Sequence, residues 1–270
     1  MNNSGKIIQH FSRHVGFVFL LATCLCVSVE AQTWPPATSV PNAPEPQEPV
    51  TLRAMPLNLL KDQGMIWSSP ARIRGEDFGY LIPLGLAVTG AITTDHQAMS
   101  EVVSRNASFN NANTNASNVL LGPFIAAPAA MFAVGHLAGN DHARETGILG
   151  GEAILNGLVV EQGMKLMFLR ERPTVDNAKG KFFQTSVGWD SSLPSSHSVI
   201  AWSSAAVLAE EYPGRLNQIG FYGLATGVSL TRVLGQQHFP SDVLVGSAFG
   251  WMIGHYVYKK HHRWHASDLP

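Results

Sequence analysis

The apolar positions of the chain fall into runs that are separated by polar or Gly/Pro-bearing breaks. Alternation with a period of two is scarce, and Ala, Leu, Gly and Met dominate over clusters of β-branched residues, which favours helices over strands. We predict one all-α bundle domain of about six helices over residues 76–260. The six runs that predict helices are 78–93, 119–138, 146–169, 199–209, 219–234 and 243–258.

Two further segments follow from the same pattern. The Asn-rich stretch 106–118 is predicted to be a loop, because Asn favours local turns over helix interiors. Residues 261–270 follow the last apolar run and are predicted to form a tail.

The N-terminal end predicts export. Lys6 and Arg13 precede the apolar run 15–29, and Val29 and Ala31 place small residues at the −3 and −1 positions before Gln32. We expect a signal peptide over residues 1–31, and hence a periplasmic or secreted protein. An uncleaved anchor helix is the alternative, but a run of about 15 apolar residues is short for a membrane span, which needs about 20.

Residues 32–75 are predicted to form a Pro-rich linker and N-terminal extension. Six prolines between Trp34 and Val50 block helix and strand pairing alike, so this part is expected to be a semi-rigid spacer. A proline-rich ligand for a partner domain is the alternative. Both cysteines, Cys24 and Cys26, lie in the apolar run of the signal peptide and therefore form no disulfide framework.

The composition excludes several classes of protein. Hydrophobic residues make up 45% of the 270 residues and charged residues 14%, which excludes a disordered chain. The net charge of −1 supplies no strong basic field for nucleic acid, so no nucleic-acid partner is expected. The run 119–138 has 20 residues without a formal charge, but the other runs are shorter or more polar. The sequence thus favours a soluble or peripheral protein over an integral one, with membrane association as the alternative.

Two groups of residues suggest an anion site. Within the run that ends before Pro173, Lys165 and Arg172 are seven positions apart, which predicts that both lie on one helix face, two turns apart. Glu161 stands four residues before Lys165, so an ordinary ion pair explains that lysine equally well.

The second group is Pro194-Ser195-Ser196-His197, directly before an apolar run. Ser is a good helix N-cap, and the free N–H groups and the helix dipole attract anions there. A plain cap beside a surface histidine is the alternative.

A third group is Arg232, followed by His238 and Asp242. Pro240 is expected to begin a helix, which would bring the Asp242 carboxylate back to one imidazole nitrogen of His238. A carboxylate there fixes the tautomer and leaves the other nitrogen as a nucleophile. A buried His–Asp hydrogen bond without catalysis is the alternative. Together, the three groups offer the cations and histidines that phosphoryl transfer through a covalent histidine needs.

These motifs, Lys165-x6-Arg172-Pro173, Pro194-Ser195-Ser196-His197 and Thr231-Arg232-x5-His238-x3-Asp242, resemble those of the type 2 phosphatidic acid phosphatase superfamily. That superfamily also contains bacterial class A acid phosphatases and vanadium-dependent haloperoxidases. The resemblance implies their helical fold and hydrolysis of phosphomonoesters, including lipid phosphates or pyrophosphates, with a small-molecule or lipid phosphate as substrate. It implies that His238 is the nucleophile, Asp242 its orienting partner and His197 the general acid. The implied phosphate ligands are Lys165, Arg172, Ser195, Ser196 and Arg232.

Two positions depart from the family pattern. Ser196 stands where Gly is usual, so a close backbone approach to phosphate must tolerate a side chain, and Thr231 replaces a usual Ser. No cofactor is expected, and vanadate is expected to inhibit. One alternative is a vanadate-dependent haloperoxidase, in which vanadate would be the cofactor. Another is a helical protein that binds phosphate or lipid without turnover.

Two remaining features contain histidine or acidic residues outside these motifs. His255, His261, His262 and His265 have no acidic or cysteine partner at a metal-binding spacing, so a basic helix end and a solvated tail are expected, and no metal site. Asp95 and His96 follow an apolar run, and the sequence assigns them no role.

Overall fold

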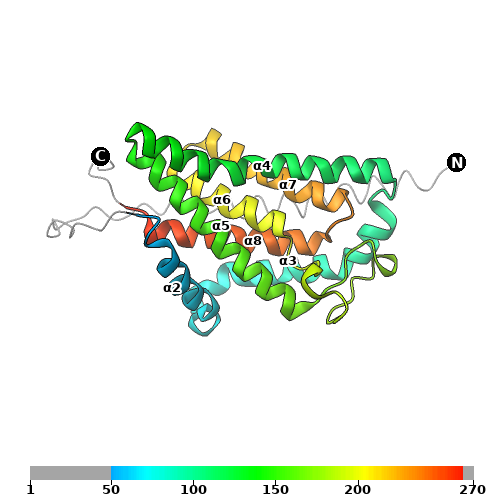
Figure 1. Cartoon of the computed structure of the whole chain (residues 1–270). Helices are drawn as coiled ribbons and strands as arrows, with labels where there is room; N and C mark the ends of the chain where they lie inside the picture. Colours follow the sequence, from blue (N-terminus) through cyan, green and yellow to red (C-terminus); the bar gives the residue numbers. More distant parts are fainter. Residues whose placement is uncertain (1–49, 264–270) are drawn as a thin grey trace. The chain divides into compact units, whose positions relative to one another are not determined.

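The computed structural model describes residues 50–263, and within this range it contains seven α-helices and no strand (Figure 1). The predicted all-α fold is confirmed, and each of the six predicted runs overlaps one helix from α3 to α8. The predicted signal peptide, most of the Pro-rich segment and the end of the predicted tail lie outside the described residues. The helices are α2 (Met55–Trp67), α3 (Phe78–Gln97), α4 (Ala107–Ala138), α5 (Asp141–Phe168), α6 (Ser196–Glu211), α7 (Arg215–Leu234) and α8 (Pro240–His261).

Helix α2 lies within the predicted N-terminal extension and packs on α5. The side chain of Gln63 donates to Asn156 Oδ1 at 2.8 Å and to its backbone oxygen at 3.1 Å. The Trp67 ring lies over Gly163, where an added Cβ would come within 2.7 Å of the ring. Polar contacts and close packing against a glycine of α5 therefore hold α2 in place. The pattern of apolar runs along the chain does not predict contacts of this kind.

The Asn-rich stretch 106–118 is helical, so the predicted loop is wrong. Asn106 is the N-cap of α4, and its Oδ1 accepts from the Phe109 N–H at 3.1 Å. The buried positions Ser117, Leu121 and Phe124 then recur every three or four residues and face the bundle. One Asn begins the helix, and packing of the buried face outweighs the weak helix propensity of the others.

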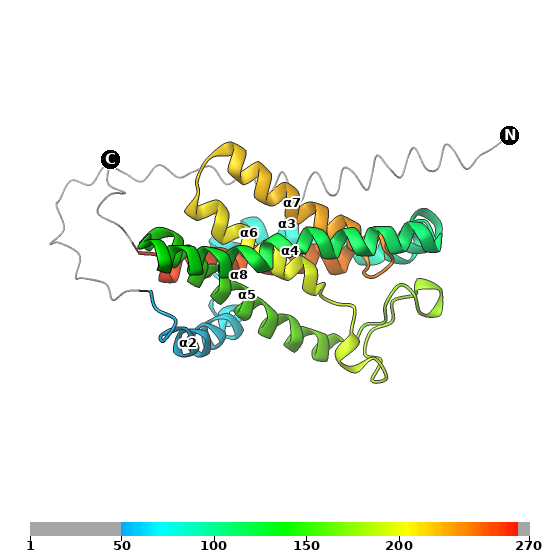
Figure 2. The ribbon, with the colours of Figure 1, turned by 45° about the horizontal axis from the view of Figure 1, so that its top comes forward.

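Helices α6 and α8 pack closely side by side in both views (Figures 1 and 2). Gly246, Gly250 and Gly254 form a stripe on α8 at a spacing of four. A Cβ added at these glycines would lie 2.8, 2.6 and 2.4 Å from backbone oxygens of α6. The glycines therefore allow main chain to meet main chain, and the N-terminal ends of the two helices become neighbours. The backbone N–H of Ser195 donates to the Asp242 carbonyl at 3.1 Å.

Candidate active site

The last turns of α5 carry a buried charged cluster. Lys165 Nζ lies 2.7 Å from Glu161 Oε1, which is the i,i+4 ion pair considered above. Ser196 joins this pair: its hydroxyl accepts from Lys165 Nζ at 3.1 Å and donates to Glu161 Oε1 at 2.6 Å. The side chain that stands in place of the usual Gly thus links α6 to α5 through the lysine of the first motif.

Arg172 does not lie on the same helix face as Lys165, so this part of the prediction is wrong. Helix α5 ends at Phe168, and Leu169 adopts a left-handed conformation with φ 42°. The carbonyls of Phe168 and Leu169 accept from the N–H groups of Phe183 and Gln184 at 2.8 and 3.0 Å. The chain therefore leaves the helix before Pro173, because a returning loop takes over the hydrogen bonds.

Arg172 is held instead between the loop and the residue that precedes His238. Its Nε and Nη2 donate to Asp190 Oδ1 at 3.0 and 2.8 Å, and Nη1 donates to the Gln237 carbonyl at 3.0 Å. The contact with Gln237 places the Arg172 guanidinium beside the third motif. It does so although Arg172 is not on the helix that carries Lys165.

The second motif forms the N-terminal end of α6. Ser195 is buried and is the N-cap, with Oγ accepting from the Ser198 N–H at 3.5 Å, so the predicted cap is confirmed. His197 follows in the first turn, with Nε2 2.8 Å from Asn118 Oδ1 of α4. Asn118 belongs to the stretch that was predicted to be a loop, and the sequence therefore gave no reason to place it here.

His238 is only 2% exposed and is oriented by a backbone carbonyl. Its Nδ1 lies 2.8 Å from the Ser192 oxygen, whereas Asp242 Oδ2 is 3.8 Å away. Because a carbonyl only accepts, Nδ1 carries the proton and Nε2 carries the lone pair of the neutral ring. The expected tautomer is thus set by Ser192, and Asp242 adds charge at a longer distance.

Asp242 is fully buried at the start of α8 and has several donors. Its Oδ2 accepts from the Ser192 hydroxyl at 2.5 Å and from the Phe239 N–H at 2.8 Å, and Oδ1 accepts from Arg170 Nη1 at 2.6 Å. Burial alone would raise the pKa of Asp242, but Arg170 and His238 lower it below its usual value. The group therefore stays an anion next to the His238 ring.

Arg170 is a central residue that the sequence did not single out. It is 2% exposed, and Nη2 lies 2.7 Å from Asp95 Oδ2 while Nη1 contacts both Asp242 and the Ser241 hydroxyl. Its guanidinium also stacks 4.1 Å over the Phe239 ring. Asp95 thus gains a role as the second carboxylate of a buried Asp–Arg–Asp group. The available signal was that Asp95 and Arg170 each stand just after an apolar run, where a charge that becomes buried needs a partner.

Arg232 is a buried cation without a carboxylate partner. Its Nη1 donates to Ser117 Oγ at 3.2 Å, its Nε has no hydrogen-bond partner, and no carboxylate pairs with it in residues 50–263. Burial and then the charge of Arg172 lower the pKa of Arg232 to about 10, so it remains protonated at neutral pH. A buried guanidinium of this kind is suited to an anionic ligand.

The predicted cations and histidines act on one another electrostatically. Burial and, in decreasing order, the charges of Arg232, His238, Arg172 and Lys165 together lower the pKa of His197 to about 3. Burial likewise lowers the pKa of His238 to about 4, opposed by Asp242. Residues of the three motifs are therefore close enough to shift one another's pKa values.

Thr231 does not contribute its hydroxyl to this place. Its Oγ1 donates to the carbonyls of Gly227 and Val228 within α7, at 2.7 and 2.9 Å. The Thr231 hydroxyl therefore bonds to backbone carbonyls of its own helix.

The described residues form an all-helical protein with a cluster of buried cations and histidines, and a comparison with protein families agrees with the resemblance of its motifs. Residues 145–266 match the PAP2 superfamily, and the resemblance seen in the motifs is confirmed. The match implies phosphatase-like activity on phosphate esters. Searches among curated proteins and among solved structures found no significant match.

Proposed function

We propose that this protein is a phosphoric monoester hydrolase of the acid phosphatase or phosphatidic acid phosphatase type, with His238 as nucleophile. The observation that carries the proposal is Arg232, a buried cation without a carboxylate partner, next to two histidines and two further cations. Phosphoryl transfer needs such positive charge around the three equatorial oxygens of the phosphoryl group. Lys165, Arg172 and Arg232 supply it.

In the first step, Nε2 of His238 attacks phosphorus and the bond between phosphorus and the ester oxygen breaks. His197 gives its proton to the leaving oxygen, so the alcohol departs neutral. The phosphorylated ring keeps its proton on Nδ1, where the Ser192 carbonyl accepts it and Asp242 balances the positive charge. In the second step, water attacks phosphorus, gives a proton to His197, and releases phosphate from a neutral His238.

Burial is the main cause of the low pKa of His197, and neighbouring positive charges lower it further. Three of the charges that lower it belong to Arg232, Arg172 and Lys165. A bound phosphate ester would offset these charges and thereby raise the pKa of His197, which favours its protonated form when substrate is present. Binding of the substrate thus favours protonation of His197, the general acid.

The test is to trap the phosphoenzyme. After mixing with a chromogenic phosphomonoester and denaturation in alkali, which preserves phosphohistidine, mass spectrometry should place the phosphoryl group on His238. We expect His238→Ala to abolish both the adduct and turnover, while His136→Ala, on the exposed end of α4, keeps both. Binding of the ester without turnover by the wild-type protein would instead identify a phosphate-binding protein.

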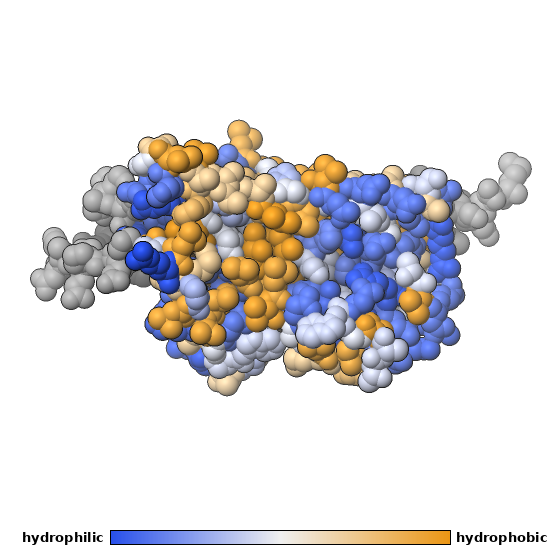
Figure 3. Space-filling model, viewed as in Figure 1, coloured by the Kyte–Doolittle hydropathy of each residue, from blue (hydrophilic) through white to orange (hydrophobic). Residues whose placement is uncertain are grey.

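We also propose export of the protein and lipid phosphates as its substrate class. Large apolar side chains are exposed on α3, α4 and α7, including Leu86, Leu137 and Leu216 at 69, 85 and 86%. Among the described residues, α4 alone is long and apolar enough to cross a membrane, and only 22% of its most apolar window is buried, unlike a core helix of a soluble protein. Figure 3 shows a broad hydrophobic area across the middle of one face, beside a mainly hydrophilic end. This surface favours contact with lipid.

A vesicle assay separates lipid from soluble substrates. We expect the mature protein to sediment with phosphatidylcholine vesicles and to have a higher kcat/KM for phosphatidic acid in those vesicles than for a soluble monoester. Fractionation of the producing cells should place it outside the cytoplasm. A protein that stays in the supernatant and prefers the soluble ester would contradict the lipid assignment but not the phosphatase.

A further inference from the structure

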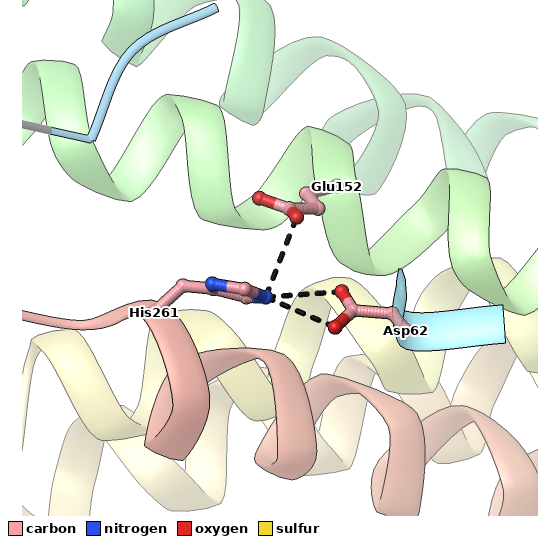
Figure 4. A group of neighbouring side chains, drawn as sticks. All are labelled: Asp62, Glu152 and His261. Carbon is pink, nitrogen blue, oxygen red and sulfur yellow. Dashed lines mark hydrogen bonds and ion pairs between the residues drawn. The ribbon is translucent and has the colours of Figure 1, made fainter. Parts of the chain in front are cut away.

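A second group of ionisable side chains lies at the far end of α8 from the phosphate site. His261 is the last residue of this helix of 22 residues, whereas Asp242 lies in its first turn and His238 two residues before the helix. At 1.5 Å per residue, the two ends are about 30 Å apart. His261 meets Asp62 of α2 and Glu152 of α5, and Figure 4 shows the three side chains pointing toward one another from three helices.

The three side chains offer ligand atoms at the separations that a metal ion requires. His261 Nε2 lies 3.0 and 3.1 Å from the two oxygens of Asp62 and 3.6 Å from Glu152 Oε1. One ligand atom from each residue lies within 4.8 Å of the others. Ligands held at about 2.0–2.2 Å from a common ion are themselves about 3–4.4 Å apart. The group could therefore close around an ion with small side-chain adjustments.

Glu152 provides an independent indication of a missing ligand. Its side chain is 0% exposed, and neither carboxylate oxygen has a hydrogen-bond partner among the described residues. The ion-pair contact with His261 at 3.6 Å is too long for a hydrogen bond. Burial raises the pKa of Glu152 to about 7; His261 and the Asn58 side chain oppose this rise, and Asp62 adds to it. A buried carboxylate without hydrogen bonds is costly unless a cation compensates it.

Asp62, in contrast, already has the supporting contacts of a metal ligand. Asn156 Nδ2 donates to Oδ2 at 3.2 Å and the Tyr256 hydroxyl donates to Oδ1 at 3.0 Å. The lone pairs of Asp62 that now face His261 Nε2 would face the ion instead when the metal is bound. Such outer contacts orient carboxylate ligands in known metal sites.

We propose that Asp62, Glu152 and His261 bind one divalent transition-metal ion, with Zn²⁺ as the best fit. Two carboxylates and one imidazole suit Zn²⁺ and similar ions better than Ca²⁺ or Mg²⁺, which prefer oxygen ligands alone. The ion would join α2, α5 and α8 and so fasten the N-terminal helix to the bundle. Its distance from His238 makes the role structural rather than catalytic. The three residues lie at positions 62, 152 and 261, far apart in the sequence. A search for ligands at short spacings therefore predicts no metal site here.

A neighbouring group of similar composition serves as an internal control. Glu211 accepts from His142 at 2.9 Å and lies 3.2 Å from His262, and Glu145 accepts from the Arg263 N–H at 2.8 Å. These two carboxylates accept hydrogen bonds, whereas the Glu152 carboxylate has no such partner in the described part of the chain. We therefore expect Glu211→Gln to leave metal binding intact.

Metal binding can be measured directly on the tag-free mature protein. After removal of metals by chelation, titration with ZnCl₂ in a calorimeter should show one ion per chain, and Co²⁺ should give the absorption bands of a bound ion with nitrogen and oxygen ligands. Saturating Zn²⁺ should raise the Tm, because it binds only the folded state. We expect Glu152→Gln to weaken binding at least tenfold, since even loss of an outer partner typically costs about 10–100-fold.

The outcomes decide the proposal without reference to phosphatase activity. If wild type binds no stoichiometric ion and its Tm is unchanged by Zn²⁺, protonated His261 is the only cation of this group and the proposal is wrong. The same conclusion follows if Glu152→Gln binds Zn²⁺ as tightly as wild type does. The wild-type titration needs no variant, so a variant that fails to fold does not obscure the result.

Discussion

At the scale of single residues, Ser196 shows how one added hydroxyl changes a site. Its oxygen lies between Lys165 and Glu161, where a glycine would leave open space. The lysine of the first motif is therefore shared between an internal carboxylate, a hydroxyl and the expected phosphate. Fewer internal partners should leave it more available to the substrate.

Ser196→Gly tests this sharing. We expect kcat/KM to rise several-fold, because Lys165 loses one internal partner and the backbone can approach phosphate more closely. The Tm should fall slightly, since glycine in a helix costs up to about 1 kcal/mol. Steady-state kinetics and thermal melts measure both effects. A lower kcat/KM would mean that the hydroxyl positions Lys165 rather than competing for it.

The buried His238 predicts an unusual pH dependence. Its pKa of about 4 means that the ring stays neutral, and therefore nucleophilic, until the pH falls to about 4. The kcat/KM profile should thus show no loss of activity on the acid side near pH 6.5, the usual pKa of histidine. Profiles for two esters with different phosphate pKa values distinguish the enzyme's titration from the substrate's. An acid limb near pH 6.5 for both esters would contradict the burial argument.

At the scale of elements, buried contacts between helices decide where the reacting groups stand. Arg170 joins Asp95 of α3 to Asp242 of α8, and the glycine stripe sets α8 against α6. The first contact orients the partner of His238, and the second brings the two histidine-bearing ends together. Changes at either contact should therefore affect both stability and chemistry.

Asp95→Asn tests the positioning role of the Asp–Arg–Asp group. Breaking a buried ion pair costs about 3–5 kcal/mol, so the Tm should fall clearly. We expect kcat to decrease with little change in KM, because Arg170 would then shift relative to Asp242 while the phosphate ligands remain. Glu76→Gln removes an exposed pair with Arg74 and should change neither quantity. A lower Tm with unchanged kcat would show that the group only stabilises the fold.

Gly250→Ala tests the contact between α6 and α8. The added Cβ would lie 2.6 Å from the Val199 oxygen, so the helices must separate, and we expect about 1–3 kcal/mol of destabilisation and reduced kcat. Gly220→Ala on α7 meets nothing within 4 Å and should leave activity unchanged with equal or higher stability. Denaturant unfolding and kinetics measure both. Equal behaviour of the two variants would contradict the close-packing argument.

At the scale of the whole molecule, charge is distributed unevenly. The chain has a net charge of −1, yet Lys165, Arg172 and Arg232 lie together near His197. Small anions of phosphate geometry should therefore bind strongly, whereas extended polyanions find no wide basic surface. The arrangement favours selection by size as well as by charge.

Inhibition measurements test this selectivity. We expect vanadate to inhibit competitively, because it can occupy the phosphate site, and double-stranded DNA at the same charge concentration to have no effect. Potent inhibition by DNA would reveal a basic surface that the net charge conceals. Halide oxidation that appears with vanadate would favour the haloperoxidase alternative.

The sequence predicted the residues whose types and spacing form local motifs, and it missed contacts between distant segments. The helices α3 to α8 follow from apolar runs, and the N-cap at Ser195 follows from local chemistry. The register of Arg172 was wrong because a loop replaced the last helical turn. Asp95 and the group around Glu152 depend on partners tens of residues away, and spacing rules do not contain that information.

The glycine stripe of α8 also affects how the protein can vary. Where Gly246, Gly250 and Gly254 meet α6, the spacing between the two helices is fixed by peptide atoms, which are the same for every amino acid. Side chains outside this stripe and outside the Asp95–Arg170–Asp242 group can therefore be exchanged with little movement of the nucleophile relative to the proton donor. Evolution or engineering can therefore change the surface that contacts the substrate while the spacing between α6 and α8 stays the same.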